Sequence, residues 1–95
     1  MFLFGEIGSN IVLLRKAKRI TQEQLALRAD MSVSYLRAIE HGRANPTVEA
    51  LDRLAKVLAV PLPVLFILSL DAAEVMDMLG HSKMELEVTA RRNAV

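Results

Sequence analysis

The sequence predicts an all-α fold, one domain of five helices followed by an extension at the carboxyl end. Apolar residues recur at three- and four-residue spacing from Glu6 to Phe66, the period of helices that bury one face. Hydroxyl residues suited to helix N-caps precede three of these segments. With 95 residues, the chain has the length of one domain.

The first two helices follow from apolar spacing and from capping. Apolar residues at helical period predict a first helix over residues 6–18. Thr21 is followed three residues later by Gln24, a capping-box pattern, so a second helix is expected over residues 22–29. The predicted core positions are Ile7, Ile11, Leu14 and Ala17 in the first helix and Leu25, Ala26 and Ala29 in the second.

The next three helices are marked by their end residues. Ser32 caps a third helix over residues 33–41, and Gly42 ends it in the left-handed conformation. Thr47 caps a fourth helix over residues 48–58. Prolines at positions 61 and 63 suit the first turn of a fifth. The predicted core positions are Val48, Leu51, Leu54, Ala55 and Leu58, with Val60, Leu62, Leu65 and Phe66 closing the core.

The extension has a pattern of its own. Asp71 and Glu74 repeat the capping-box spacing, and the apolar residues after them predict a short C-terminal helix. Residues 84–90, "MELEVTA", alternate apolar and polar side chains, which is typical of a strand that needs a partner. We therefore divide the chain into a domain over residues 1–68 and an extension over residues 69–95.

Composition narrows the functional classes. The net charge is +1, so nucleic-acid binding has to depend on where the cations lie. There is no cysteine and the two histidines have no partner pattern, so no metal site and no cofactor are expected. No set of side chains pairs a nucleophile with a base, so an enzyme is not expected. The apolar run "VPLPVLFILSL" is shorter than the roughly 20 residues of a membrane span. "MFLFGE" lacks a basic region and a cleavage site, so a signal peptide is not expected. The absence of cysteine fits a reducing compartment, so a cytoplasmic location is expected.

The third predicted helix carries an unusual outer face. Leu36 and Ile39 set its buried direction, and the opposite arc spans about 140°. This arc mixes a hydroxyl, a guanidinium, an imidazole and small apolar groups, as contact with DNA base edges requires, although a plain solvent face is the alternative. Two short helices joined by a tight break also have helix-turn-helix spacing. The arc consists of Val33, Ser34, Arg37, Ala38 and His41.

The segment "TQEQLALRADMSVSYLRAIEHGRANPTVEALDRLAKVLAVPLPVLF" resembles the Cro/repressor-type (XRE-like) helix-turn-helix family. That family includes phage repressors and restriction–modification controller proteins. The resemblance covers residues 6–66 and includes "TQEQLA" and "NPT" at the starts of predicted helices. It implies a lambda-repressor-like domain, with the third helix as the recognition helix of a sequence-specific transcriptional regulator.

The resemblance also implies roles for individual residues. Asp30 stands where the family usually has glycine, and Asp tolerates the left-handed conformation better than most residues. Val33 stands where polar residues are common, which favours contact with a thymine methyl group. Gln22 would contact a phosphate or brace the recognition helix. The implied base contacts are Val33, Ser34, Arg37 and Ala38, the phosphate contacts are Gln22, Ser32, Tyr35, His41, Arg43 and Asn45, and the structural ion pair is Arg15–Glu40.

The stretch from Val60 to Leu70 has more apolar residues than a small domain can bury alone, and the segment after it adds further ones. An exposed apolar patch of this size usually marks an interface, so we expect a two-fold homodimer. Its recognition helices would lie roughly 34 Å apart on a palindromic operator. A tail folded onto its own domain is one alternative, and an antitoxin-like chain whose tail binds a second protein is another. The predicted interface residues are Val64, Ile67, Leu68, Leu70, Val75, Met76 and Leu79.

Overall fold

The computed structural model describes residues 2–67 and Asp77, and over these residues its elements are all helical. The predicted all-α class is therefore confirmed. The predicted helix after Asp71, the strand over residues 84–90 and the boundary between residues 68 and 69 lie outside the described residues. The helices are α1 (Phe2–Ala17), α2 (Gln22–Arg28), α3 (Val33–Glu40), α4 (Val48–Leu58) and the 3-10 helix η1 (Leu62–Phe66).

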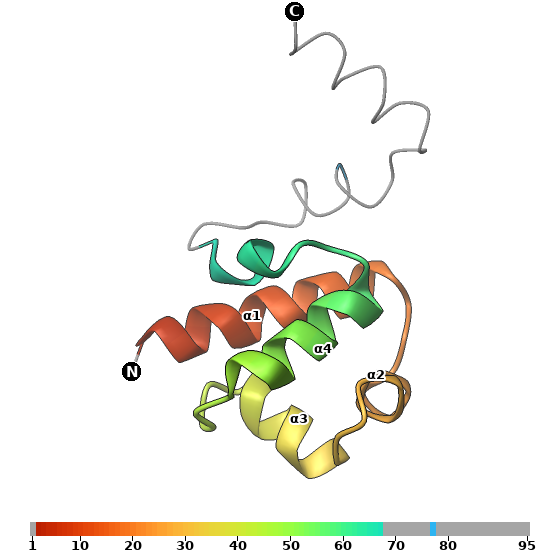
Figure 1. Cartoon of the computed structure of the whole chain (residues 1–95), viewed down its shortest axis with the longest axis horizontal. Helices are drawn as coiled ribbons and strands as arrows, with labels where there is room; N and C mark the ends of the chain where they lie inside the picture. The colour runs from red at the N-terminus through yellow and green to blue at the C-terminus, as the bar shows by residue number, and fades with distance from the viewer. Residues whose placement is uncertain (1, 68–76, 78–95) are drawn as a thin grey trace, which may run out of the picture.

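The helix α1 forms the centre of the domain. It packs against α3, α4 and η1, while α2 packs against α3 and α4. Figure 1 shows α4 in front of α1, with η1 above them and the α2–α3 pair below. Within the described ranges, none of the helices is long and apolar enough to cross a bilayer.

The predicted N-caps are present. The Thr21 side chain accepts a hydrogen bond from the Gln24 backbone, and Gln24 reciprocates in a complete capping box. The Ser32 hydroxyl accepts from the Tyr35 N–H at 3.0 Å. The Thr47 hydroxyl likewise caps α4. Each cap satisfies a backbone donor that the helix itself leaves unpaired, so the starts of α2, α3 and α4 are determined locally.

The helix α1 begins earlier than predicted, at Phe2 instead of Glu6. Leu3 and Phe4 pack against the core, so tertiary burial extends the helix beyond the amphipathic pattern. Gly8 is buried where α1 crosses the end of α3, and a Cβ there would lie 2.6 Å from the Glu40 carbonyl oxygen. Only a glycine lets the two backbones come this close.

Most predicted core residues are buried, but two predictions are wrong. Val48 is 67% exposed, because a first-turn side chain tilts towards the N-terminal end of its helix and here points past it. Phe66 is 37% exposed whereas Leu65 is fully buried. The fifth helix is a 3-10 helix with three residues per turn, which places Leu62 and Leu65 on one side and turns Phe66 outward.

Asn10 is a buried polar residue that the sequence reading did not single out. Its Nδ2 donates to the backbone carbonyls of Leu65 at 2.9 Å and Ile67 at 2.7 Å. The amide thereby satisfies carbonyls at the end of η1 and ties this segment to α1. A polar residue on the same face as Ile7 and Leu14 was the available signal in the sequence.

Candidate nucleic-acid interface

The helices α2 and α3 form a helix-turn-helix pair. Asp30, in the turn, adopts the left-handed conformation with φ of 57°, as expected for an Asp at the position where the family usually has glycine. The Met31 N–H donates to the Ala26 carbonyl at 3.0 Å and closes the end of α2. Ala26 and Ala29 are buried, and such small side chains let two helices cross closely. At the other end of α3, Gly42 adopts φ of 71°, as predicted.

The outer face of α3 has the expected pattern of exposure. Leu36 and Ile39 are buried, whereas Ser34 and Arg37 are exposed. Val33 and Ala38 are half-buried, and Val33 packs in part against the core. Of the four predicted base contacts, two polar side chains therefore reach solvent and two small apolar ones lie at the base of the same helix face.

A buried ion pair fixes α3 against α1. Arg15 Nε donates to Glu40 Oε2 at 2.7 Å and Arg15 Nη2 to Oε1 at 3.2 Å, in the bidentate geometry that Arg and carboxylates favour. The Arg15 and Glu40 side chains are only 12% and 2% exposed. Arg15 Nη1 also donates to the Ile20 carbonyl at 3.1 Å. The predicted Arg15–Glu40 pair is thus present and joins α1, the α1–α2 turn and α3.

The ion pair continues outward through Gln22 to Arg37. Gln22 Nε2 donates to Glu40 Oε1 at 2.8 Å, and Gln22 Oε1 accepts from Arg37 Nε at 3.1 Å. Arg37 Nη2 lies 3.5 Å from Glu23 Oε1. Gln22 was expected either to contact a phosphate or to brace α3. Its hydrogen bonds to Glu40 and Arg37 show that it braces α3. Glu23 was missed, since residues 14 positions apart in the sequence gave no pattern that joined it to Arg37.

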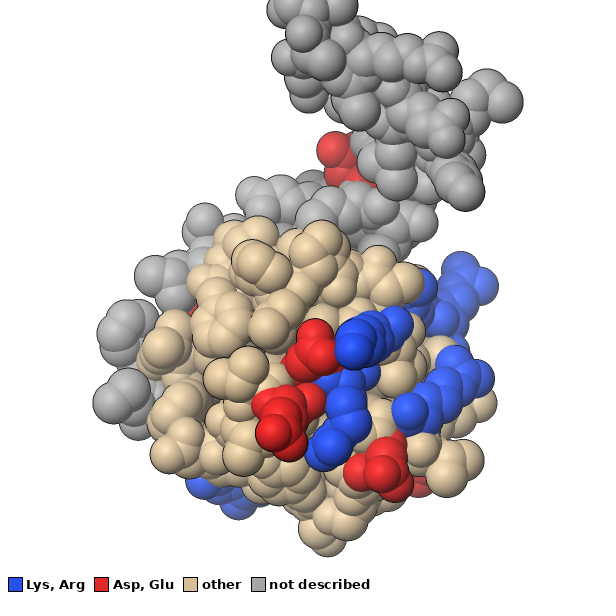
Figure 2. Space-filling model, viewed as in Figure 1, with Lys and Arg blue, Asp and Glu red and all other residues tan. Residues whose placement is uncertain are grey.

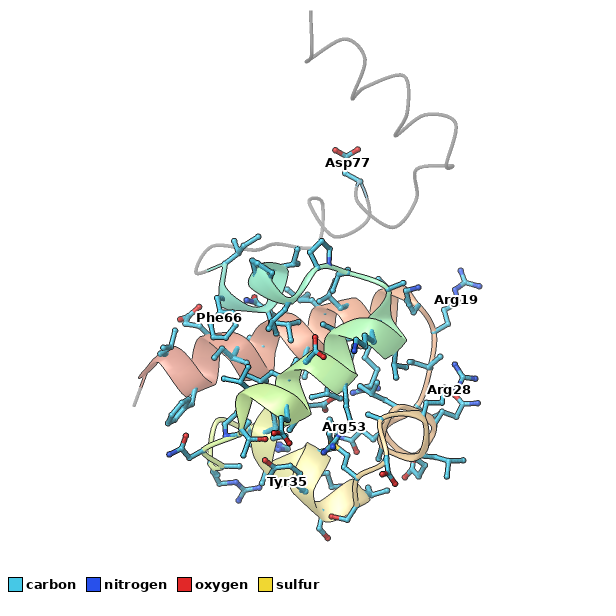
Figure 3. The ribbon with its side chains drawn as sticks, viewed as in Figure 1. Arg19, Arg28, Tyr35, Arg53, Phe66 and Asp77 are labelled. Atoms are coloured by element: carbon cyan, nitrogen blue, oxygen red, sulfur yellow. The ribbon has the colours of Figure 1, made fainter. Side chains whose placement is uncertain are left out.

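The residues predicted to contact phosphates lie along α3 and the loop after it. Ser32 Oγ accepts from the Tyr35 N–H, so its own O–H stays available to donate. Tyr35 is half-buried and projects from α3 on the side away from α2, as Figure 3 shows. His41 Nδ1 lies 2.7 Å from the Arg37 carbonyl oxygen. Arg43 and Asn45 are exposed in the α3–α4 loop.

Cations gather on one flank of the domain. Figure 2 shows Lys and Arg over the side that carries α2 and the α1–α2 turn, with acidic groups nearby. Arg19 and Arg28 point outward there, and Arg53 lies on α4 (Figure 3). Lys56 forms an exposed pair with Asp52 at 3.0 Å. A positive flank of this kind attracts a phosphate backbone, in line with the excess of cations over acidic residues in the first 43 residues of the sequence.

The site contains little that would suit a metal. Among the residues that the structure describes, no three His, Cys, Asp or Glu side chains lie close enough together to hold an ion. His81 lies outside those residues. The chemistry that the site does offer is a row of hydrogen-bond donors beside small apolar groups, which is the chemistry of base and phosphate contacts.

Comparison with known proteins identifies the family. A helix-turn-helix family model matches residues 11–65, which include α2, α3 and α4. The chain therefore belongs to the helix-turn-helix family, in its Cro/repressor-type branch of transcriptional regulators and repressors.

Individual relatives agree with this family. An uncharacterised HTH-type transcriptional regulator, y4dJ of Sinorhizobium fredii, is 46% identical over 54 residues, which are 57% of this chain and 70% of that protein. The immunity repressor protein of Bacillus phage phi105 is 41% identical over 57% of this chain, but the match spans only 38% of the repressor. The crystal structure of the restriction-modification controller protein C.AhdI from Aeromonas hydrophila has a TM-score of 0.68 and 29% identity, over 70% of this chain and 100% of that chain.

Proposed function

We propose that this protein is a transcriptional repressor that binds a palindromic operator as a homodimer, in the cytoplasm and without a catalytic activity. The observation that carries the proposal is that α3 is fixed on its inner side and exposed on its outer side. Its inner side is locked by the buried Arg15–Glu40 pair, while Ser34 and Arg37 stand exposed on its outer side. A helix held rigidly and presenting hydrogen-bond donors is suited to enter a major groove.

In this mechanism, α3 lies in the major groove and reads base edges. Ser34 and Arg37 would form hydrogen bonds with bases, and Val33 and Ala38 would contact thymine methyl groups. Phosphate contacts would position the domain and make affinity fall with salt. The proposed phosphate-contact residues are Gln22, Ser32, Tyr35, His41, Arg43 and Asn45, with the cationic flank beside them.

The proposed dimer interface begins at η1. Val64 is half-buried, and Phe66 and Ile67 are each 37% exposed at the end of this helix. Apolar side chains left exposed at one end of a small domain favour association with a second copy. In the proposed division, residues 1–68 bind DNA and residues 69–95 contribute to dimerisation. The other proposed interface residues, Leu68, Leu70, Val75, Met76 and Leu79, lie outside the described residues.

Selection of bound duplexes from a random pool tests this function, with the oligomeric state measured by light scattering. We expect an enriched palindrome whose half-sites are centred about 10–10.5 base pairs apart, or a multiple of that, and a particle of twice the 10.5 kDa chain mass. If no duplex is enriched even at low ionic strength, DNA binding is excluded. An enriched site without symmetry, bound by a single chain, would exclude the dimer alone.

A further inference from the structure

Arg37 contacts α2 through one edge of its guanidinium, which leaves another edge open. Its Nε donates to Gln22 Oε1 at 3.1 Å, and its Nη2 lies 3.5 Å from Glu23 Oε1. Nε and Nη2 share the lateral edge of the planar group, and the fixed fork has five N–H donors in all. Nη1 and the second hydrogen of Nη2 therefore remain as a pair of parallel donors at the end of the side chain.

The direction of this free end follows from the buried ion pair. Gln22 Nε2 donates to Glu40 Oε1 at 2.8 Å, so the amide oxygen of Gln22 must face the other way, towards Arg37. Glu40 is in turn held by Arg15 at 2.7 Å and its side chain is 2% exposed. A chain of hydrogen bonds thus runs from the core to the exposed guanidinium and restricts its rotation.

Glu23 adds a charge to the same site. Its side chain is 63% exposed and that of Arg37 is 52% exposed, so both would stand at a bound DNA surface. A phosphate and a guanine edge can each accept two parallel N–H donors. The carboxylate beside Arg37 repels a phosphate, whereas it imposes a smaller penalty on a neutral base. Glu23 therefore biases Arg37 towards base edges.

We propose that Arg37 recognises a guanine end-on, with Nη1 and Nη2 donating to O6 and N7, and that Gln22 and Glu23 are its positioning residues. This inference depends on the proposed DNA-binding function and assigns the base class and two residues that determine specificity. Guanine is the base that presents two adjacent acceptors in the major groove. Adenine presents an amino group in place of O6 and would face Arg37 with a donor.

The test uses the full chain and the duplex that it selects. Substitution Arg37→Ala first identifies the base pair whose discrimination depends on this side chain, and we expect a guanine there. Replacing that guanine by adenine should lower the affinity of the unmodified protein for the duplex about 5- to 150-fold. Replacing it by 7-deazaguanine, which lacks the N7 acceptor, should also weaken binding. Neither replacement should change the affinity of the Arg37→Ala variant for the duplex.

Positioning is tested with Glu23→Gln and Gln22→Ala. Both should reduce the guanine-over-adenine preference several-fold, and Glu23→Gln should also raise affinity for random duplex. The control Glu49→Gln removes one exposed acidic charge from α4 and should change affinity for all duplexes equally. Thermal midpoints within a few degrees of the unmodified protein would exclude misfolding as the cause, as expected for a pair as exposed as Glu23–Arg37.

The outcomes distinguish failure of this inference from failure of the proposed DNA-binding function. A guanine preference that is unchanged in both variants would overturn the positioning roles while leaving DNA binding intact. A uniform loss of affinity on all sequences in Arg37→Ala would make it a phosphate contact and overturn the guanine assignment. A protein that enriches no duplex would overturn the proposed function itself, and the guanine contact with it.

Discussion

The helix α1 holds two neighbours, α3 and η1, by different means. It binds α3 through the buried Arg15–Glu40 pair and through the close backbone approach at Gly8. It binds η1 through apolar packing and one amide, that of Asn10. A buried charge pair tolerates little change in register, because both charges lose their compensation if they separate. The comparison indicates that α3 is fixed firmly in orientation by a buried charge pair, while η1 is held by apolar packing with a single polar anchor, Asn10.

The largest expected effect comes from breaking the ion pair. Glu40→Ala leaves the Arg15 guanidinium, 12% exposed, without its carboxylate. We expect the free energy of unfolding to fall by about 3–5 kcal/mol, measured by urea denaturation followed by circular dichroism. The control Lys56→Ala removes the exposed pair with Asp52 and should cost about 1 kcal/mol or less. Equal losses in the two variants would show that the buried pair does not secure α3.

The second effect concerns the crossing of α1 and α3. A Cβ added by Gly8→Ala would meet the carbonyl oxygens of Ile39 and Glu40, both backbone atoms. We expect the helices to move apart at a cost of about 1–3 kcal/mol, measured by the same denaturation. Gly5→Ala is a matched control in the same helix. Among the described residues, no atom lies within 4 Å of its added Cβ, so it should be neutral or stabilising. A neutral Gly8→Ala would contradict the close approach.

The third effect tests η1. Asn10→Ala removes both hydrogen bonds to the Leu65 and Ile67 carbonyls, and we expect a loss of about 1–3 kcal/mol. Compared with the unmodified protein, the variant should show faster hydrogen exchange at the amides of η1. Exchange in α3 should stay unchanged, since the ion pair is untouched. Ser9→Ala, at an exposed neighbouring position, should change neither quantity. Equal acceleration in α3 and η1 would mean that the two attachments are not separate.

The smallest effect is a stabilisation before η1. Ala59 ends α4 with φ of 58°, in the left-handed region that disfavours residues with a Cβ. Ala59→Gly should raise the free energy of unfolding by about 0.5–1 kcal/mol, again measured in urea. The control Ala50→Gly, inside α4, should instead lower it by about 1 kcal/mol. A destabilised Ala59→Gly variant would show that the lost methyl group matters more than the relieved strain.

Capping and periodicity allowed most of the fold to be predicted. Thr21, Ser32 and Thr47 begin helices, and Gly42 ends one, because their side chains or backbone freedom act within a few residues. The two short helices and the tight break between them predicted the helix-turn-helix from the residues, whereas the Arg15–Glu40 pair was found through the family resemblance. Val48 and Phe66 were misjudged, because their exposure depends on the end of a helix and on the 3-10 geometry of η1.

The amino-acid sequence alone was enough to predict the helices and the turn between α2 and α3, since these follow from local backbone preferences and a repeating apolar pattern. Its motifs were enough to reveal the family resemblance. The packed structure was needed to show that Gly8 lets two backbones meet, that Asn10 caps η1 and that Glu23 joins Gln22 in holding Arg37. These contacts join residues from different helices, far apart along the chain. Their partners are set by how the helices cross, and no spacing within one helix encodes that crossing.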